Sequence, residues 1–346
     1  MDIIIGENCI GKLNEYLRSN RATELYIITD DNVNALHMEK LKEVIKGYDM
    51  NTYTLSPGEE SKSISTILSI YDDLIENNID RDAIILSFGG GVVGDIAGFA
   101  ASTYKRGLKY IQIPTTLLAQ VDSSVGGKVG IDYGGYKNIV GSFYFPELTL
   151  VDIQFLDTLK DREIICGLGE VLKYGLIYDY DLFQFTMDNM EQIYNKDLDI
   201  LLQIIRRSIT IKEEVVNRDR YDTGLRMILN FGHTIGHGIE AYYDFGRYNH
   251  GEAIILGMIY ESKIAYRMGL IDEKYFQTIY QGLRKLVAPV KFNGYEIEQL
   301  IHRMKNDKKN KGDRIAFILP ISRGKVKLHM DVDEGLIAES LKGEWV

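Results

Sequence analysis

The sequence has few cysteines, no long apolar run and fewer basic than acidic residues. Among its 346 residues are two cysteines, Cys9 and Cys166, which cannot form a disulfide framework and suit a reducing compartment. The 40 Lys and Arg against 50 Asp and Glu give a net charge of −10, which argues against a nucleic-acid partner but permits a local cationic pocket. No segment approaches the ~20 apolar residues of a membrane span, and the N-terminus lacks a basic leader region. We therefore expect a cytoplasmic protein with no membrane partner.

The chain is long enough for two domains, and its composition, 45% hydrophobic and 26% charged, is typical of a globular protein. Its first half alternates short apolar runs with helical periods, which favours an α/β fold with a parallel sheet. From residue 155 the pattern becomes mostly helical, so we expect an α/β domain over residues 1–155 and a helical domain over 156–346. Expected strands are 25–29, 52–55, 83–88, 110–113, 148–152, 315–319 and 325–329. Expected helices include 35–46, 61–77, 201–217, one through His233, 253–268 and one from 334.

Three of the six histidines lie close together in sequence, in NFGHTIGH (residues 230–237) and HGEA (residues 250–253). His233 and His237 are four apart, so on a helix both rings leave one face. The pair is not the zinc-protease motif, which needs Glu where this chain has Thr234. One interpretation is that these histidines are hydrogen-bonded within a helical core. Three of them together instead favour a metal or catalytic site. Glu170 could add a carboxylate ligand, unless it forms only a surface salt bridge with Lys173.

The strand expected at residues 83–88 leads into GGGVVGD (residues 89–95). Exposed amides and the dipole of a following helix would suit a pyrophosphate. As a dinucleotide-binding fingerprint the stretch is imperfect. That fingerprint has an acidic residue about twenty positions after the glycines, and this chain has Lys109 there. A glycine-rich structural turn therefore stays open, with Asp95 in the first helical turn matching only the helix dipole.

Small residues, hydroxyls and separated cations follow, in segments we expect to be loops: 105–107, 114–116, 122–128 and 134–138. This inventory suits an anionic substrate, because Lys and Arg supply charge and Gly lets the backbone approach. Each lysine taken alone is equally consistent with a solvated surface.

Taken together, these motifs resemble those of the 3-dehydroquinate synthase family over nearly the whole chain. The matching stretches are GGGVVGD (89–95), YKRG (104–107), PTTLLAQVDSSVGGK (114–128), KNIVGSFY (137–144), GLGEVLKYG (167–175), LNFGHTIGH (229–237), HGEA (250–253) and DKK (307–309). Cys166 stands where many members have Asn. The order and spacing of the motifs carry the resemblance more than any one of them.

The resemblance implies an NAD-binding α/β domain, a mostly helical metal-binding domain and a homodimer. It implies zinc or cobalt bound by Glu170, His233 and His250. It implies NAD contacts at Asp30, Asn32, Glu59, Lys62, Gly90, Gly91, Asp95, Thr115, Thr116, Lys137, Phe155 and Thr158. It implies substrate contacts at Arg106, Asp122, Lys128, Asn138, Lys173, Lys212, Arg226, Asn230, His237 and either Lys308 or Lys309. Catalytic roles would fall on Asp122, Lys128, Asn138, Lys173 and His237.

The implied reaction converts 3-deoxy-D-arabino-heptulosonate 7-phosphate to 3-dehydroquinate and phosphate, in the shikimate pathway of aromatic amino acid biosynthesis. Transient oxidation by NAD, phosphate elimination, re-reduction, ring opening and aldol closure give no net redox change. Another sugar-phosphate cyclase and a metal- and NAD-dependent polyol dehydrogenase are the alternatives, but a neutral polyol would not need so many cations. A third alternative is a regulatory NAD-binding module with a structural zinc. A structural zinc normally has four protein ligands, whereas three candidate ligands and no nearby pair of cysteines are found here.

Overall fold

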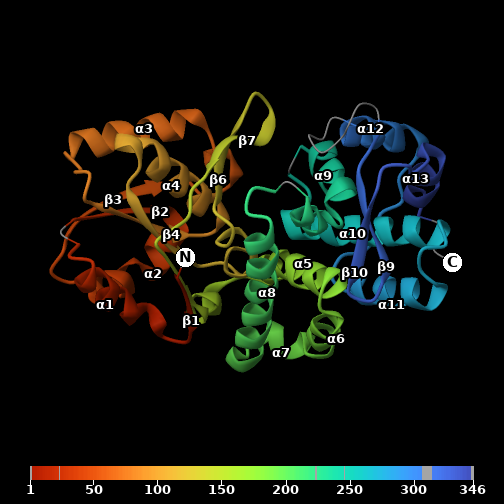
Figure 1. Cartoon of the computed structure of the whole chain (residues 1–346), viewed down its shortest axis with the longest axis horizontal. Helices are drawn as coiled ribbons and strands as arrows, with labels where there is room; N and C mark the ends of the chain where they lie inside the picture. Colours follow the sequence, from red (N-terminus) through yellow and green to blue (C-terminus); the bar gives the residue numbers. More distant parts are fainter. Residues whose placement is uncertain (1, 23, 223, 245, 306–313, 344–346) are drawn as a thin grey trace. The chain divides into compact units, whose positions relative to one another are not determined.

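The computed structural model describes residues 2–22, 24–222, 224–244, 246–305 and 314–343 (Figure 1). The chain divides into two compact units, residues 1–164 with 192–209 and residues 165–191 with 210–346. Helices α5 (Asp161–Ile177), α7 (Met190–Tyr194) and α8 (Leu198–Arg218) contribute residues to both units. Among the described residues, no helix is both long and apolar enough to cross a membrane.

The first unit is built on a parallel six-stranded sheet, as the alternation of strands and helices predicts. Its strand order is β1-β8-β5-β4-β2-β3, and every neighbouring pair is parallel. The strands are β1 (Asp2–Gly6), β2 (Glu24–Asp30), β3 (Asp49–Leu55), β4 (Ile84–Gly89), β5 (Lys109–Pro114) and β8 (Leu148–Asp152). The α-helices are α1 (Lys12–Ser19), α2 (Asp31–Val44), α3 (Ile64–Glu76) and α4 (Gly91–Thr103).

Both faces of this sheet are covered by helices (Figure 1). Along β2, Tyr26 and Ile28 pack into the core under α3 and α4, while Leu25 and Ile27 pack into the core under α1 and α2. Successive side chains of a strand point to opposite faces, so a strand buried on both sides is continuously apolar. The ends of the sheet, rather than its faces, therefore remain for binding.

One expectation about the helices of this unit was wrong in part, and another was wrong. The apolar residues of the helix expected at 61–77 predict a buried stripe of Ile64, Ile67, Leu68, Tyr71, Leu74 and Ile75. Helix α3 buries Ile67 and Leu74 of this stripe, together with Ile70, but leaves Ile64, Leu68 and Ile75 exposed. Helix α4 begins at Gly91, so Asp95 lies beyond its first turn rather than within it.

The segments after residue 114, which we expected to be loops, contain an antiparallel hairpin. Strands β6 (Lys128–Tyr133) and β7 (Tyr136–Phe143) form a two-stranded sheet around Gly134 and Gly135, which have φ values of 60° and 82°. Glycine adopts such positive φ angles without strain, which is why it occupies a tight hairpin turn.

The second unit is mostly helical, with one small antiparallel sheet. Its helices are α6 (Tyr180–Asp188), α9 (His233–Tyr242), α10 (His250–Arg267), α11 (Glu273–Leu283), α12 (Gly294–Lys305) and α13 (Glu334–Leu341), with parts of α5, α7 and α8. Its strands are β9 (Phe317–Ser322) and β10 (Lys325–His329). Helix α10 is buried along most of its length, which marks it as the centre of this unit.

The histidine helix is shorter than its apolar pattern predicts. In the sequence, Ile228 and Leu229 fit the same helical pattern as Ile235 and Ile239, which predicts one helix for all four. Instead, residues Leu225–Asn230 form a separate 3-10 helix and α9 begins at His233. Gly232, with φ at 80°, separates the two, in a conformation that L-residues with side chains rarely adopt.

Candidate metal centre and nucleotide edge

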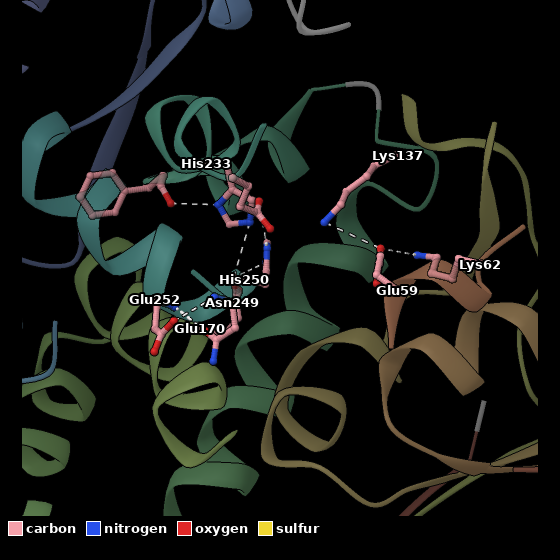
Figure 2. A network of polar contacts seen from close by, with 10 residues as sticks. Glu59, Lys62, Lys137, Glu170, His233, Asn249, His250 and Glu252 are labelled. Carbon is pink, nitrogen blue, oxygen red and sulfur yellow. Dashed lines mark hydrogen bonds and ion pairs between the residues drawn. The ribbon is translucent and has the colours of Figure 1, made fainter. Parts of the chain in front are cut away.

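Three possible metal ligands converge from three helices of the second unit: Glu170 from α5, His233 from α9 and His250 from α10 (Figure 2). Glu170 Oε1 lies 3.5 Å from His233 Nε2 and 3.6 Å from His250 Nε2. Their ligand atoms all lie within 4.8 Å of one another. Glu170 is fully buried, and its Oε1 has no hydrogen-bond partner among the described residues.

The geometry fits a divalent metal. Two donors at about 2.0–2.1 Å from a tetrahedral ion lie about 3.4 Å apart, close to both carboxylate–imidazole separations. A buried carboxylate oxygen without a partner is costly, and a cation between the three side chains would satisfy it. Two imidazoles and a carboxylate leave a fourth position open, as in catalytic rather than structural zinc sites.

Glycines beside the ligands let the helices approach closely enough to bring the ligands together. A Cβ on Gly251, next to His250, would lie 1.9 Å from the Cys166 carbonyl oxygen on α5. A Cβ on Gly257 would lie 1.8 Å from the carbonyl oxygen of Gly232, next to His233. Only residues without a side chain permit these two backbone contacts, so the glycines set the spacing of α5, α9 and α10.

A buried carboxylate holds the start of the histidine helix. Glu261, on α10, is fully buried and accepts hydrogen bonds from the backbone N–H groups of Gly232 at 2.6 Å and Ile235 at 3.1 Å. Gly232 has no side chain with which to cap α9, so Glu261 supplies the cap from the neighbouring helix. The contact fixes the first turn of α9, which carries His233.

Charge in this cluster is paired. Lys173 forms an ion pair with Glu170, and both are buried, so the interpretation of this pair as a surface salt bridge was wrong. Burial lowers the pKa of His250, but the carboxylates of Glu240 and Glu170 outweigh burial and raise the pKa to about 10. The site thus favours a positive charge on or beside the His250 ring, which a bound cation would supply in place of the proton.

Of the other ligand candidates of this unit, His237 lies beside the cluster, and the rest lie on other elements. His237 has its ring centroid 5.2 Å from that of His233 and 6.0 Å from that of His250. Lys212 on α8 and Arg226 are both buried, and Arg226 lies in the same 3-10 helix as Asn230. Buried cations are unusual in an acidic protein and supply positive charge for an anionic ligand.

In the first unit, the residues expected to contact NAD follow the carboxyl ends of the sheet strands. Asp30 ends β2 and caps α2, accepting N–H groups from Asn32 at 2.9 Å and Val33 at 3.0 Å. The other expected residues on these connections are Glu59 and Lys62 after β3, Gly90, Gly91 and Asp95 after β4, Thr115 and Thr116 after β5, and Phe155 and Thr158 after β8. Because the strands are parallel and adjacent, all of these connections lie at one edge of the sheet.

The start of α4 is shaped for close approach by a ligand. Gly90 caps the helix, and a Cβ there would lie 3.1 Å from Thr116 Cγ2, while a Cβ on Gly91 would lie 3.0 Å from Ser123 Oγ. The buried Thr115 Oγ1 has no hydrogen-bond partner in the described part of the chain. The N–H groups of a helix start, small residues and an unsatisfied hydroxyl fit a nucleotide pyrophosphate.

Lys62 contacts residues that we expected to have separate roles: Glu59 and Asp95 as NAD contacts and Asn138 as a substrate contact. Figure 2 shows its ion pair with Glu59. Lys62 is buried, its Nζ lies 2.8 Å from Asp95 Oδ2 and 3.6 Å from Glu59 Oε1, and it also donates to Asn138 Oδ1. Lys137 Nζ lies 3.8 Å from the same Glu59 oxygen. Burial lowers the pKa of Lys62, but the Asp95 and Glu59 carboxylates outweigh it and raise the pKa, so the residue is an ammonium.

Some expected residues are not gathered at this edge. Arg106 is exposed and precedes Lys109, which pairs with Ile84 at the amino end of β4, so Arg106 lies near the opposite edge of the sheet. Lys128 is an exposed residue at the start of β6. Asp122, by contrast, lies in the short helix Ala119–Ser123 after β5, next to the Ser123 that faces Gly91. Lys308 and Lys309 lie outside the described residues.

Glu240 and Glu261 are among the buried acids of the second unit that sequence reasoning missed. Glu240 lies seven residues after His233 and three after His237, so helical spacing alone places it on the histidine face. Glu261 interrupts the apolar run of α10, and a lone acid in such a run needs a buried partner. These two signals were available in the sequence.

Fold and site together define the class of protein. It has an α/β unit in which the carboxyl edge of the sheet suits a nucleotide, followed by a helical unit in which two histidines and one carboxylate could hold a metal and leave a fourth position open. Family models extend the assignment. Residues 52–166 match the model described as 3-dehydroquinate synthase N-terminal, and residues 167–310 match 3-dehydroquinate synthase C-terminal. The chain belongs to the 3-dehydroquinate synthase family.

Individual relatives agree with this assignment. The chain is 43% identical to a 3-dehydroquinate synthase from Alkaliphilus metalliredigens (strain QYMF), over 94% of this chain and 91% of that protein. It is similar to the structure of a 2-epi-5-epi-valiolone synthase from Streptomyces hygroscopicus subsp. jinggangensis 5008 with NAD+ and Zn2+ bound (TM-score 0.90, 27% identity, 98% and 95% coverage). It also resembles a 2-deoxy-scyllo-inosose synthase complexed with carbaglucose-6-phosphate, NAD+ and Co2+ (TM-score 0.88, 30% identity, 98% and 96% coverage).

Proposed function

We propose that this protein is a 3-dehydroquinate synthase, a carbon–oxygen lyase that converts 3-deoxy-D-arabino-heptulosonate 7-phosphate to 3-dehydroquinate and phosphate. The observation that carries the proposal is the convergence of Glu170, His233 and His250 from three helices, in a chain of this family. Identity is higher to the dehydroquinate synthase, 43%, than to the structure of the inosose synthase, 30%, which favours the former reaction over another cyclisation.

NAD and a divalent metal, zinc or cobalt, are the cofactors that the residues fit. Glu170, His233 and His250 would hold the metal, and the connections after β2, β3, β4, β5 and β8 would hold NAD. When bound, the two cofactors would supply reversible hydride acceptance and Lewis acidity toward a substrate oxygen. Related structures with NAD+ and either Zn2+ or Co2+ support this choice.

The residues of the chain would bind and orient a substrate with two anionic groups. Lys173, Lys212 and Arg226 are buried cations in the unit that contains the metal cluster. Cations that are already ordered and desolvated bind phosphate and carboxylate more strongly than exposed ones. His237, whose ring lies beside both histidine ligands, would stand where a proton can be moved or a substrate hydroxyl held.

The protein would act as a homodimer in the cytoplasm. The hairpin β6–β7 exposes apolar side chains, among them Tyr133, Tyr136 and Ile139, which a second copy could cover. Both cysteines are buried and neither forms a disulfide, which suits a reducing compartment. Light scattering should give twice the chain mass, and Ile139→Lys should lower it toward the single chain.

Substrate choice tests the function against its rivals. Metal-stripped protein should be inactive, and Zn2+ or Co2+ should restore phosphate release from the heptulosonate phosphate when NAD is present. D-glucose 6-phosphate should release none. Phosphate released only from the six-carbon sugar would indicate another sugar-phosphate cyclase, and full activity of the stripped protein would remove the metal from the reaction.

A further inference from the structure

The ring of His250 lies between two carboxylates. Its Nε2 lies 3.6 Å from Glu170 Oε1, on the side of the proposed metal, and its Nδ1 lies 3.6 Å from Glu240 Oε2. Glu240 is buried on α9, while His250 is the first residue of α10. The two helices pack closely at Gly236 on α9, because a Cβ on this residue would lie only 3.0 Å from the carbonyl oxygen of Ala253 on α10.

We infer that Glu240 is a positioning residue for the metal site, acting through His250. Its carboxylate would take the Nδ1–H of the imidazole, which leaves the Nε2 lone pair directed toward the metal. Metal-bound histidines commonly present their second nitrogen to a carboxylate, which fixes the ring and makes it a stronger donor. The inference rests on the proposed function only in assuming that Glu170, His233 and His250 hold the metal.

His233 shows the same arrangement with a different partner. Its Nδ1 lies 3.1 Å from the carbonyl oxygen of Phe231, and its Nε2 faces Glu170. In both histidines, then, Nε2 faces the shared carboxylate and Nδ1 faces a separate oxygen. The shared pattern is what a metal site with oriented imidazoles requires. The carboxylate behind His250 carries a full charge, whereas the carbonyl behind His233 does not, so Glu240 is the partner whose charge can be tested.

A different role for Glu240 is geometrically possible, since His237, Glu240 and His250 also have ligand atoms within 4.8 Å of one another. As a second metal site, however, this group would share His250 with the first. The imidazole of His250 would then bridge two divalent cations, which would repel each other strongly because only the ring separates them. We therefore assign Glu240 to the support of one metal ion rather than to a second one.

The test compares metal binding by the wild-type chain, Glu240→Gln and Glu252→Gln. In Glu240→Gln, the new amide oxygen can still accept the Nδ1–H but carries no charge, so the fold should be retained. Glu252→Gln is the matched control, because it removes the same charge near the start of α10, where Glu252 accepts the Asn249 N–H at 2.8 Å. Each metal-free protein is titrated with Co2+, and Zn2+ affinity is measured by competition with a chelator.

We expect one ion per wild-type chain and about 10–100-fold weaker binding by Glu240→Gln, with an altered visible spectrum of bound Co2+. NAD affinity and the unfolding midpoint of the metal-free protein should stay unchanged in Glu240→Gln. Glu252→Gln should bind within twofold of wild type. Equal affinity in wild type and Glu240→Gln, an equal loss in Glu252→Gln, or two ions per wild-type chain would each overturn the inference. A wild-type chain that binds no metal would instead refute the proposed metal site.

Discussion

Replacing Gly251 by alanine should damage the metal site without touching a ligand. An added Cβ would lie 1.9 Å from the Cys166 carbonyl oxygen, and a carbon–oxygen contact needs about 3.3 Å. Helices α5 and α10 must therefore separate by about 1.4 Å, the difference between these distances. Because the obstacle is backbone, no rotamer change relieves it, and an overpacked core of this kind costs about 1–3 kcal/mol.

The same displacement moves His250 away from Glu170, whose facing atoms are now 3.6 Å apart. A metal site tolerates only about 0.5 Å of displacement, so we expect at least tenfold weaker binding, or about 1.4 kcal/mol. Denaturant unfolding of the metal-free protein and Co2+ titration measure the two effects. Gly294→Ala is the control, because a Cβ there has nothing within 4 Å.

Gly251→Ala with wild-type stability and metal affinity would refute the argument that glycine packing sets the ligand geometry. A loss of equal size in Gly294→Ala would show that the effect is not specific to the contact between α5 and α10.

Three further predictions concern other parts of the molecule. Glu261→Gln keeps one acceptor but leaves a buried N–H of Gly232 or Ile235 unpaired, so denaturant titration should show a loss of about 1–3 kcal/mol; no loss would remove its capping role. Burial raises the pKa of Cys9 to about 11, above the unfolded value, so the native state favours the neutral thiol. Its contribution to stability should be complete below about pH 9 and decline toward pH 11, and Cys9→Ala should lack this decline when the two are compared by denaturant unfolding. Gly91→Val places a branched side chain at the start of α4, 3.0 Å from Ser123 Oγ at the Cβ position, and calorimetry should show weaker NAD binding in a folded protein. Unchanged NAD affinity would reduce this stretch to a structural turn.

The sequence predicts the parallel sheet because its strands are apolar on both faces and alternate with helices. It predicts the histidine helix because a spacing of four residues places His233 and His237 on one face. It makes the buried face of α3 too wide, because Leu68 and Ile67 are equally apolar and both lie in the predicted stripe, whereas tertiary packing buries Ile67 and leaves Leu68 exposed. Local propensity cannot make that selection.

Long-range contacts account for the other differences. The hairpin β6–β7 was missed because its glycines and polar residues are typical of loops, whereas strand pairing depends on residues on both sides of the turn. Nothing in the sequence near His250 states that Glu240 lies behind its ring, because the contact joins two helices. The family resemblance supplies the ligands, but only the structure shows what holds them.

The central claim is that this protein releases phosphate from 3-deoxy-D-arabino-heptulosonate 7-phosphate with NAD used and restored in each turnover. The most direct measurement follows phosphate, 3-dehydroquinate and NADH absorbance together in one reaction with metal-loaded protein. We predict equal amounts of phosphate and 3-dehydroquinate, many times the amount of NAD present, with no accumulation of NADH. NADH formed in proportion to turnover, or turnover without phosphate release, would contradict the account.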